Sequence, residues 1–220
     1  ARAVTSRQRP WASAPPVATP VDGKKREMMV PLGVSNRHMH LCREHVDILF
    51  GEGYEMKVLK ELYQPGYFAV QERVLVVGKR RCLEGVAILM PERPISQVEL
   101  SQTDAISLGL KLGVAESGAD PVSQQILLVG PKGQVVLPGG KGGGAYIARR
   151  HMHIGPADAA ALGLKEGYLV DIVIDGDRPT TYHGVLIRIR EGWRAEVHLD
   201  TDEANAAGLK NGDMVRLVVP

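Results

Sequence analysis

The sequence predicts a mainly β protein built from two homologous small β-barrel domains with short helices, related by an internal duplication. The tetrapeptide Arg-His-Met-His occurs twice, at residues 37–40 and 150–153. A longer stretch, VELSQTDAISLGLKLG at 98–113, aligns without gaps with VHLDTDEANAAGLKNG at 197–212. Agreement at many fixed positions indicates a repeat. Short apolar segments separated by turn residues lie between these motifs, as is typical of strands in small barrels.

Individual elements follow from the local patterns. Strands are predicted over residues 68–78, 83–89, 169–176 and 182–190, where apolar residues alternate loosely with polar ones. Helices are predicted after each histidine pair, over 43–50 and 156–164, and near the end of the chain over 201–209. Thr201 or Asp202 is a suitable N-cap for the last of these helices.

The repeat divides the chain into four predicted segments. Residues 1–29, rich in Ala, Pro, Arg and Ser, are expected to form a flexible N-terminal tether. Residues 30–137 form the first β-barrel unit, residues 138–144 a glycine-rich linker, and residues 145–220 the second β-barrel unit. The chain begins with Ala rather than Met, which leaves open what preceded residue 1.

Composition excludes several classes of protein. The formal charge is +2, with 27 basic and 25 acidic residues and no long run of either sign, so we expect no nucleic-acid partner. No apolar run reaches the roughly 18 residues of a membrane span, so no membrane partner is expected. Cys42 and Cys82 are the only cysteines and are expected to be free thiols.

The two histidine pairs predict metal binding. Side chains on a strand alternate between faces, so His38 and His40 point the same way, as do His151 and His153. The gapless alignment adds one further ligand to each pair, because Glu99 aligns with His198. Neutral imidazoles and a carboxylate suit zinc. Six side chains are enough for two ions with an open position, or for one crowded site. The alternative is that these are surface or hydrogen-bonded core histidines, as we expect for His45 and His183.

Several longer motifs resemble one family. SNRHMHL (35–41), LYQPGYFAV (62–70), SQVELSQTDAISLG (96–109), the second RHMH and VHLDTDEANAAG (197–208) are similar to the PduL-type phosphotransacylases, the phosphate propanoyltransferases of propanediol utilisation. The resemblance covers nearly all of the chain from about residue 30. It implies a pair of β-barrels with a dinuclear zinc site that exchanges coenzyme A and phosphate on a short acyl group.

The resemblance also assigns roles to residues. The family's metal ligands fall on the same six positions: His38, His40, Glu99, His151, His153 and His198. Arg93 matches an arginine that holds phosphate, and Ser117 a serine near it. The positions expected near coenzyme A are Ser35, Lys60, Leu89, His198 and Asn205. The chain departs from the family at Ala87, Ala115 and Gln102, where arginine is common, so positive charge is lost. GKGGG lacks the spacing of a P-loop, which favours a linker.

The implied reaction converts propanoyl-CoA or acetyl-CoA and phosphate to acyl phosphate and free coenzyme A. Direct attack by phosphate is expected, and an acyl-cysteine on Cys42 is the alternative route. Two other functions stay open. One is a non-catalytic or degenerate zinc-binding paralogue. The other is a cupin-like metal enzyme, because His38, His40 and Glu44 mimic its ligand spacing.

Family members of this type often reside in bacterial microcompartments. The resemblance therefore implies a microcompartment or cytoplasmic location, with shell or core proteins as partners of the N-terminal region. Sequence fixes neither the acyl chain preference nor the metal in the cell. A homo-oligomer also stays open.

Overall fold

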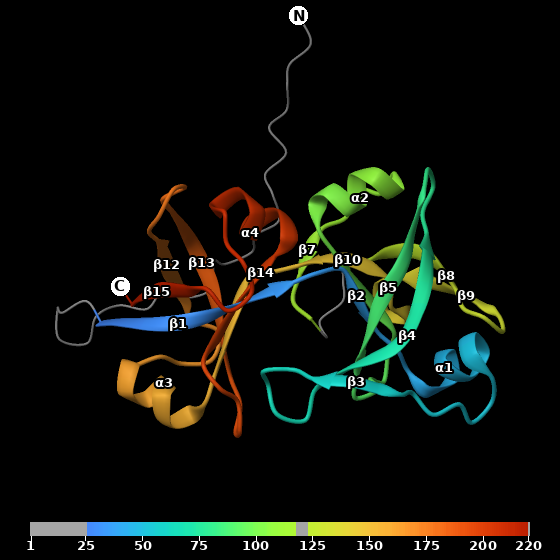
Figure 1. Ribbon diagram of the computed structural model, residues 1–220, viewed down its shortest axis with the longest axis horizontal. Helices are drawn as coiled ribbons and strands as arrows, with labels where there is room; N and C mark the ends of the chain where they lie inside the picture. Colours follow the sequence, from blue (N-terminus) through green and yellow to red (C-terminus); the bar gives the residue numbers. More distant parts are fainter. Residues whose placement is uncertain (1–25, 118–122, 220) are drawn as a thin grey trace, which may run out of the picture.

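A computed structural model, which describes residues 26–117 and 123–219, shows a mainly β chain folded into two barrels that lie side by side (Figure 1). The barrel drawn at the left of Figure 1 is a closed ring of six strands. In pairing order these are β1 (Arg26–Ser35), β14 (Glu196–Asp200), β11 (His151–Ile154), β13 (Thr180–Ile189), β12 (Leu169–Ile174) and β15 (Met214–Val219). We call this the second barrel, because most of its strands follow residue 150.

The first barrel has the same order of pairings. Its ring consists of β10 (Ala145–Ala148), β6 (Gln97–Leu100), β2 (His38–His40), β5 (Cys82–Met90), β4 (Phe68–Val77) and β8 (Gln124–Val129). Pairing between β4 and β8 closes the ring. Three further strands lie alongside it: β3 (Val58–Glu61), β7 (Val114–Ala115) and β9 (Gln134–Gly139). The expected mainly β class with barrels is thus confirmed.

One strand of each barrel comes from an unexpected part of the chain. β1 directly precedes β2 in sequence, yet it pairs with β14 and β15 of the second barrel. β10 directly precedes β11, yet it pairs with β6 and β8 of the first. The pairing therefore differs from the predicted boundaries, which put residues 30–35 in the first unit and 145–148 in the second. Residues 26–29, expected in the tether, belong to β1, and residues 1–25 lie outside the described residues.

The glycine-rich stretch is a packed turn inside the first barrel. It forms the end of β9 and a 3₁₀ turn, η1 (Gly140–Gly142). Gly143 has a φ of +82°, and a Cβ there would lie 2.1 Å from the Ser96 carbonyl oxygen. Only glycine fits this close approach. The chain instead crosses between the barrels where β1 leads into β2 and where β10 leads into β11.

Among the described residues, four short α-helices cover the barrels: α1 (Arg43–Phe50), α2 (Gln102–Leu108), α3 (Pro156–Leu162) and α4 (Thr201–Ala207). The N-cap of α4 is Asp200, one residue before the predicted cap, and it forms a capping box with Glu203. Helices α2 and α4 lie together at one end of the junction between the barrels, at the top of Figure 1. None of the helices in 26–117 and 123–219 is long and apolar enough to cross a membrane.

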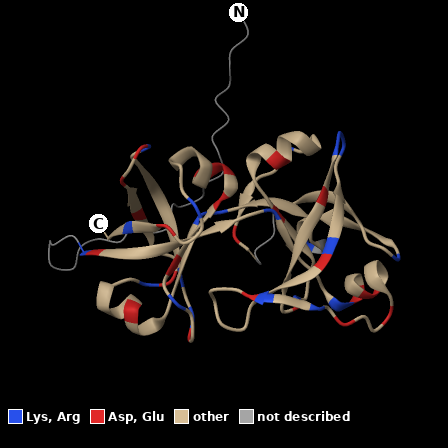
Figure 2. Ribbon diagram, in the orientation of Figure 1, with Lys and Arg blue, Asp and Glu red and all other residues tan. Residues whose placement is uncertain are grey.

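Polar contacts join the two barrels. The Thr103 amide donates to Asp202 Oδ2 at 2.7 Å, which links the start of α2 to α4. At the other end of the junction the buried Gln64, from the β3–β4 hairpin, accepts from the Arg194 amide and donates to the Arg194 carbonyl, each at 3.0 Å. Acidic and basic residues are interspersed over both barrels (Figure 2).

Candidate metal centre

Along β2 and β11 the side chains point alternately into the barrel core and outward to the candidate site. Met39 and Met152 are fully buried, and each packs into the apolar core of its own barrel. The histidines on either side of each methionine therefore point out of the barrel. This explains why the motif needs an apolar residue between two imidazoles.

The first cluster consists of His38, His40 and Glu99, all buried. His38 lies opposite Glu99 across the antiparallel pair β2–β6. His38 Nε2 is 3.5 Å from Glu99 Oε2, and His40 Nε2 is 3.8 Å from Glu99 Oε1. One potential ligand atom of each residue lies within 4.8 Å of the others, a spacing suited to one ion.

The second cluster repeats this geometry with His151, His153 and His198. His151 lies opposite His198 across the antiparallel pair β11–β14. The rings of His151 and His198 stack with centroids 4.9 Å apart, and that of His153 lies 4.6 Å from His198. Sequence alignment had paired Glu99 with His198, and the structure gives them the same position in their barrels.

Hydrogen bonds orient the first histidine of each pair in the same way. His38 Nδ1 lies 2.7 Å from the Asn36 carbonyl oxygen, and His151 Nδ1 lies 2.8 Å from that of Arg149. If each Nδ1 donates to its carbonyl, Nε2 keeps a free lone pair, which is the usual arrangement of a metal-binding histidine.

The buried polar atoms of the two clusters fit metal ions. His40 Nδ1 and His153 Nδ1 are buried without a hydrogen-bond partner. His198 Nε2 lies 3.0 Å from Glu196 Oε2, but the two atoms are not in hydrogen-bond geometry. Buried polar atoms without partners are costly unless an ion or water satisfies them. Three nitrogens of this kind, all on predicted ligands, support metal binding at both clusters.

Electrostatics keep three of the imidazoles, those of His40, His151 and His153, neutral, as metal binding requires. Burial and the charge of His198 lower the pKa of His151 to about 3. Burial also lowers the pKa values of His40 and His153 well below the usual range. Burial alone would raise the pKa of Glu99, but His38, His40 and the hydroxyls of Ser117 and Tyr146 outweigh it and lower that pKa. Glu99 also acts on the pKa of His151 in the other cluster.

The arginine of each repeated tetrapeptide has a structural role. Arg37 Nη2 lies 2.9 Å from Asp104 Oδ1 on α2, and Arg150 Nε lies 2.7 Å from Glu203 Oε1 on α4. Each ion pair ties the start of a histidine strand to the helix that follows the third ligand. The repeat of Arg-His-Met-His thus preserves a support as well as a ligand pair.

Arg93 and Ser117 lie beside the first cluster. Arg93 Nη1 donates to Ser117 Oγ at 2.7 Å, and Ser117 Oγ donates to Glu99 Oε1 at 2.7 Å. Arg93 Nη1 is itself 4.0 Å from Glu99 Oε1. Its charge also lowers the pKa values of His40 in one cluster and His153 in the other. Arg93 therefore acts electrostatically on both clusters.

The residues expected near coenzyme A fall in two places. Lys60 and Leu89 flank Ala69 on adjacent strands, Lys60 exposed on β3 and Leu89 half-buried on β5. Ser35 ends β1 in register with Asp200, the cap of the helix that carries the exposed Asn205. The remaining member of this set, His198, is in the second cluster.

The departures from the family also have defined places. Ala87 is in register with His38, so an arginine there would emerge beside the first cluster. Ala115 is buried on β7 and pairs with Ala148, whereas Gln102 is exposed at the start of α2.

Residues of the alternative readings lie outside the clusters. Glu44 is exposed on α1, and the residue that lies with His38 and His40 in the first cluster is Glu99, which does not fit the cupin-like spacing. β2 ends at His40, so Cys42 does not continue the histidine face but is the N-cap of α1. Cys42 and Cys82 are free thiols, as expected. His45 Nδ1 lies 2.7 Å from Ser96 Oγ, and His183 is exposed 2.8 Å from Asp171.

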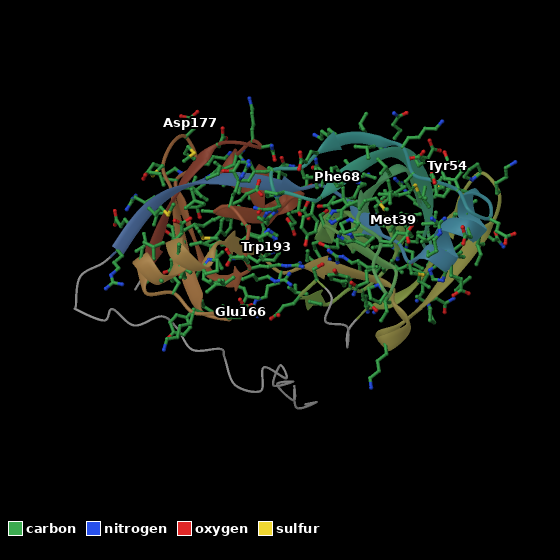
Figure 3. The ribbon with its side chains drawn as sticks, turned by 90° about the horizontal axis from the view of Figure 1, so that it is seen from below. Met39, Tyr54, Phe68, Glu166, Asp177 and Trp193 are labelled. Atoms are coloured by element: carbon green, nitrogen blue, oxygen red, sulfur yellow. The ribbon has the colours of Figure 1, made fainter. Side chains whose placement is uncertain are left out.

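Three residues near the clusters were not predicted. Tyr146, on β10, donates to Glu99 Oε1 at 2.7 Å. The repeat did not reveal that β10 belongs to the first barrel. Glu196 precedes His198 by two residues on the same strand, a spacing that could have indicated it. The Trp193 ring packs on His153 with centroids 4.0 Å apart. Figure 3 shows Trp193 on the part of the second barrel that faces the first.

Comparison with known proteins identifies the family of this chain. A model of the family described as phosphate propanoyltransferase matches residues 31–210. The chain belongs to the phosphate propanoyltransferase family. A phosphate propanoyltransferase of Thermotoga maritima is 45% identical over 195 residues, which cover 88% of this chain and 91% of the relative. Those of Lachnoclostridium phytofermentans and Priestia megaterium are 46% and 47% identical over 88% and 86% of this chain, and 89% and 85% of their own lengths.

Membership of the phosphate propanoyltransferase family makes this chain an acyltransferase. The matched residues begin within β1 and end just after α4, so they include both candidate clusters.

Proposed function

We propose that this chain transfers a short acyl group, propanoyl or acetyl, between coenzyme A and inorganic phosphate at a site of two zinc ions. The observation that carries the proposal is the pair of three-ligand clusters, one from each barrel, with Arg93 acting on histidines of both. Membership of a family of phosphate acyltransferases supports the reaction class.

His38, His40 and Glu99 would hold one ion, and His151, His153 and His198 the other. Zinc bound there would stabilise negative charge on the thioester carbonyl oxygen and on the departing thiolate. The protein's own contribution is to hold imidazoles neutral and oriented. Burial keeps His40, His151 and His153 neutral. The Asn36 and Arg149 carbonyls orient the first histidine of each pair.

In the proposed reaction a phosphate oxygen attacks the thioester carbonyl carbon. A C–O bond forms, the C–S bond breaks, and coenzyme A leaves as a thiolate that takes a proton from solvent. Arg93 would hold the phosphate dianion through its planar donors and offset its repulsion from the thioester's anionic carrier. Ser117, which bridges Arg93 and Glu99, would fix the direction of the arginine. Holding both reactants together removes much of the entropic barrier.

Coenzyme A would lie along Ser35, Lys60, Leu89, His198 and Asn205. Ala87 leaves an uncharged surface beside His38 in this chain. We infer that binding of the acyl-CoA depends on Lys60 and on apolar contact with Leu89, and not on a cation at position 87.

One assay tests the proposal. Purified protein of measured metal content is given propanoyl-CoA or acetyl-CoA, with and without phosphate, and free coenzyme A is followed with a thiol reagent. We expect release that depends on phosphate. Arg93→Gln should lower kcat/KM for phosphate by about 10- to 100-fold, the loss typical of a charged hydrogen bond. The exposed Arg81→Gln is the control and should behave like wild type.

The assay also separates the rival functions. Release that ignores phosphate indicates thioester hydrolysis. Protein that holds zinc but releases no coenzyme A is a non-catalytic paralogue. The loss of arginine at Ala87, Ala115 and Gln102 would favour that outcome. A microcompartment location with shell or core protein partners, or a homo-oligomer, stays a prediction from the family resemblance.

A further inference from the structure

A hairpin of the first barrel reaches across the junction to the second barrel. Residues 62–67 join β3 to β4, and Figure 1 shows this hairpin extending toward the second barrel. Tyr67 Oη accepts from Arg190 Nη1 at 3.1 Å, and the Arg194 guanidinium carbon lies 5.6 Å from the Tyr63 ring centroid. The hairpin therefore packs on the segment between β13 and β14, which leads into the second cluster.

The sequence alignment indicates that only one unit has this hairpin. Gly53-Tyr54 of the first unit aligns with Gly167-Tyr168 of the second. Within the described residues, Tyr168 leads directly into β12, whereas β3 and the hairpin lie between Tyr54 and β4. Strands β4 and β12 hold the same place in their rings. The hairpin is therefore an addition to the repeated fold, and its contacts suit it to a role at the junction.

Gln64 is the buried contact of the hairpin, with 5% of its surface exposed. Its side-chain amide accepts from the Arg194 N–H and donates to the Arg194 carbonyl, each at 3.0 Å, and it also donates to Glu196 Oε2 at 3.1 Å. The two contacts with the Arg194 backbone fix where the Gln64 amide lies. The third contact then holds the Glu196 carboxylate, which is itself buried.

Glu196 lies between this amide and a candidate metal ligand. Glu196 Oε2 is 3.0 Å from His198 Nε2, but the two atoms are not in hydrogen-bond geometry. Their closeness is therefore set by whatever holds each side chain. Gln64 holds the carboxylate, and β1 leaves room for it because residue 33 is glycine, where a Cβ would lie 2.8 Å from Glu196 Oε1. A carboxylate beside a ligand histidine orients the ring and strengthens metal binding.

The two clusters obtain their support from different places. Glu99 of the first cluster accepts from Ser117 and from Tyr146, each at 2.7 Å, and all three residues belong to the first barrel or follow its strand β7. At the position of Glu196 the first unit has Gln97, so the carboxylate beside the third ligand is particular to the second cluster. Its support comes from across the junction.

We propose that Gln64 is a positioning residue of the second metal cluster, which holds the Glu196 carboxylate against His198. The first barrel would thus complete a centre whose three grouped ligands all belong to the second. Glu196 is not one of those three, so it would act on the ion through His198. The inference rests on metal binding in the proposed function and not on acyl transfer. The same hairpin begins with β3, which carries Lys60 of the expected coenzyme A site.

Zinc affinity tests the inference, measured without substrates by competition with a chromophoric chelator. Glu196→Ala should weaken the binding of one of two ions by about 10- to 100-fold, the loss typical when a group that orients a ligand is removed. Gln64→Leu, similar in size but unable to hydrogen-bond, should weaken the same ion by about 10-fold. Gln71→Leu is the matched control, because Gln71 is exposed on the adjoining strand β4. It should keep both affinities within about twofold of wild type.

Two combined variants separate positioning from general support of the junction. In Glu196→Ala, the further change Gln64→Leu should cost no more affinity, because the carboxylate through which Gln64 acts is gone. In His153→Ala, which should empty the second cluster, Gln64→Leu should leave the affinity of the remaining ion unchanged. Unchanged affinities in Gln64→Leu alone, losses that add in the double variant, or weaker binding of the other ion would each overturn the inference.

A second substitution decides if Gln64→Leu does not fold. Gln64→Glu keeps an acceptor for the Arg194 amide but sets a like charge against Glu196, so the second ion should bind more weakly. Wild-type affinity in that variant would reject the inference. Wild-type protein that holds no ion at the second cluster would overturn both the inference and the proposed two-zinc site. Two bound ions without transfer of an acyl group would contradict only the proposed reaction.

Discussion

The phenol of Tyr146 donates a buried hydrogen bond of 2.7 Å to Glu99 Oε1, and the two residues are in register across β10 and β6. The corresponding pair in the second barrel is Gly33 with His198, across β1 and β14. A Cβ on Gly33 would lie 2.8 Å from Glu196 Oε1 and 3.1 Å from His198 Cε1. The strands β10 and β1 therefore suit the third residue of the cluster beside them: β10 supplies a donor for the Glu99 carboxylate, and β1 leaves space for the His198 imidazole.

Replacing Tyr146 tests the support of Glu99. Tyr146→Phe removes a hydrogen bond that orients a candidate ligand, so zinc affinity should fall about 10- to 100-fold. Competition with a chromophoric chelator measures this. Tyr54→Phe is a matched control, because Tyr54 donates to Glu72 at 2.8 Å and neither residue belongs to a cluster. Equal affinities in the two variants would mean that Tyr146 does not support the metal.

Removing one ligand should empty one cluster and spare the other. His153→Ala takes a nitrogen from the second cluster only, so bound zinc should fall from about two ions per chain to about one. Elemental analysis of the dialysed protein gives the ratio. His183→Ala, at an exposed histidine outside both clusters, should keep the wild-type ratio. Loss of all zinc from His153→Ala would point to a single shared site.

Acid should destabilise the metal-free protein in a defined window. Burial lowers the pKa of His151 to about 3, whereas an unfolded histidine titrates near about 6.5. Between these values the unfolded state binds more protons, so the free energy of unfolding falls as the pH falls below about 6.5. The slope is about 1.4 kcal/mol per pH unit for each such histidine.

Urea unfolding of the metal-free protein between pH 7.5 and 5 measures this slope. His151→Asn should show a smaller slope than wild type, because one group that titrates differently in the two states is gone. Parallel curves for the two proteins would show that His151 is not held neutral by burial.

A covalent route through Cys42 can be separated from direct attack. Cys42 caps α1, and its sulfur lies 3.5 Å from Ser96 Oγ rather than on the histidine face. We therefore expect Cys42→Ala to keep phosphate-dependent release of coenzyme A within about threefold of wild type, a change of less than about 1 kcal/mol in the barrier. Cys82→Ala, at the exposed second cysteine, is its control. Abolished activity in Cys42→Ala alone would restore the acyl-cysteine.

The sequence predicted the parts of this molecule that have a period or a repeat. Alternation in His-Met-His put two imidazoles on one face. The alignment of Glu99 with His198 found the third member of each cluster, which the structure places within 4.8 Å of the two histidines. The exchange of β1 and β10 could not be predicted, because a strand pattern carries no information about which barrel its hydrogen bonds complete. Tyr146 was missed for that reason. The duplication itself stays a prediction, supported by the matching order of pairings.

The exchanged strands have a consequence for how such a protein can be divided. A fragment that begins after residue 144 would leave a gap between β14 and β15 where β1 belongs, and the complementary fragment would lack the strand between β6 and β8. Neither gene half encodes a self-sufficient folding unit. Recombination that shuffles one half without the other would therefore yield open sheets with unpaired edges.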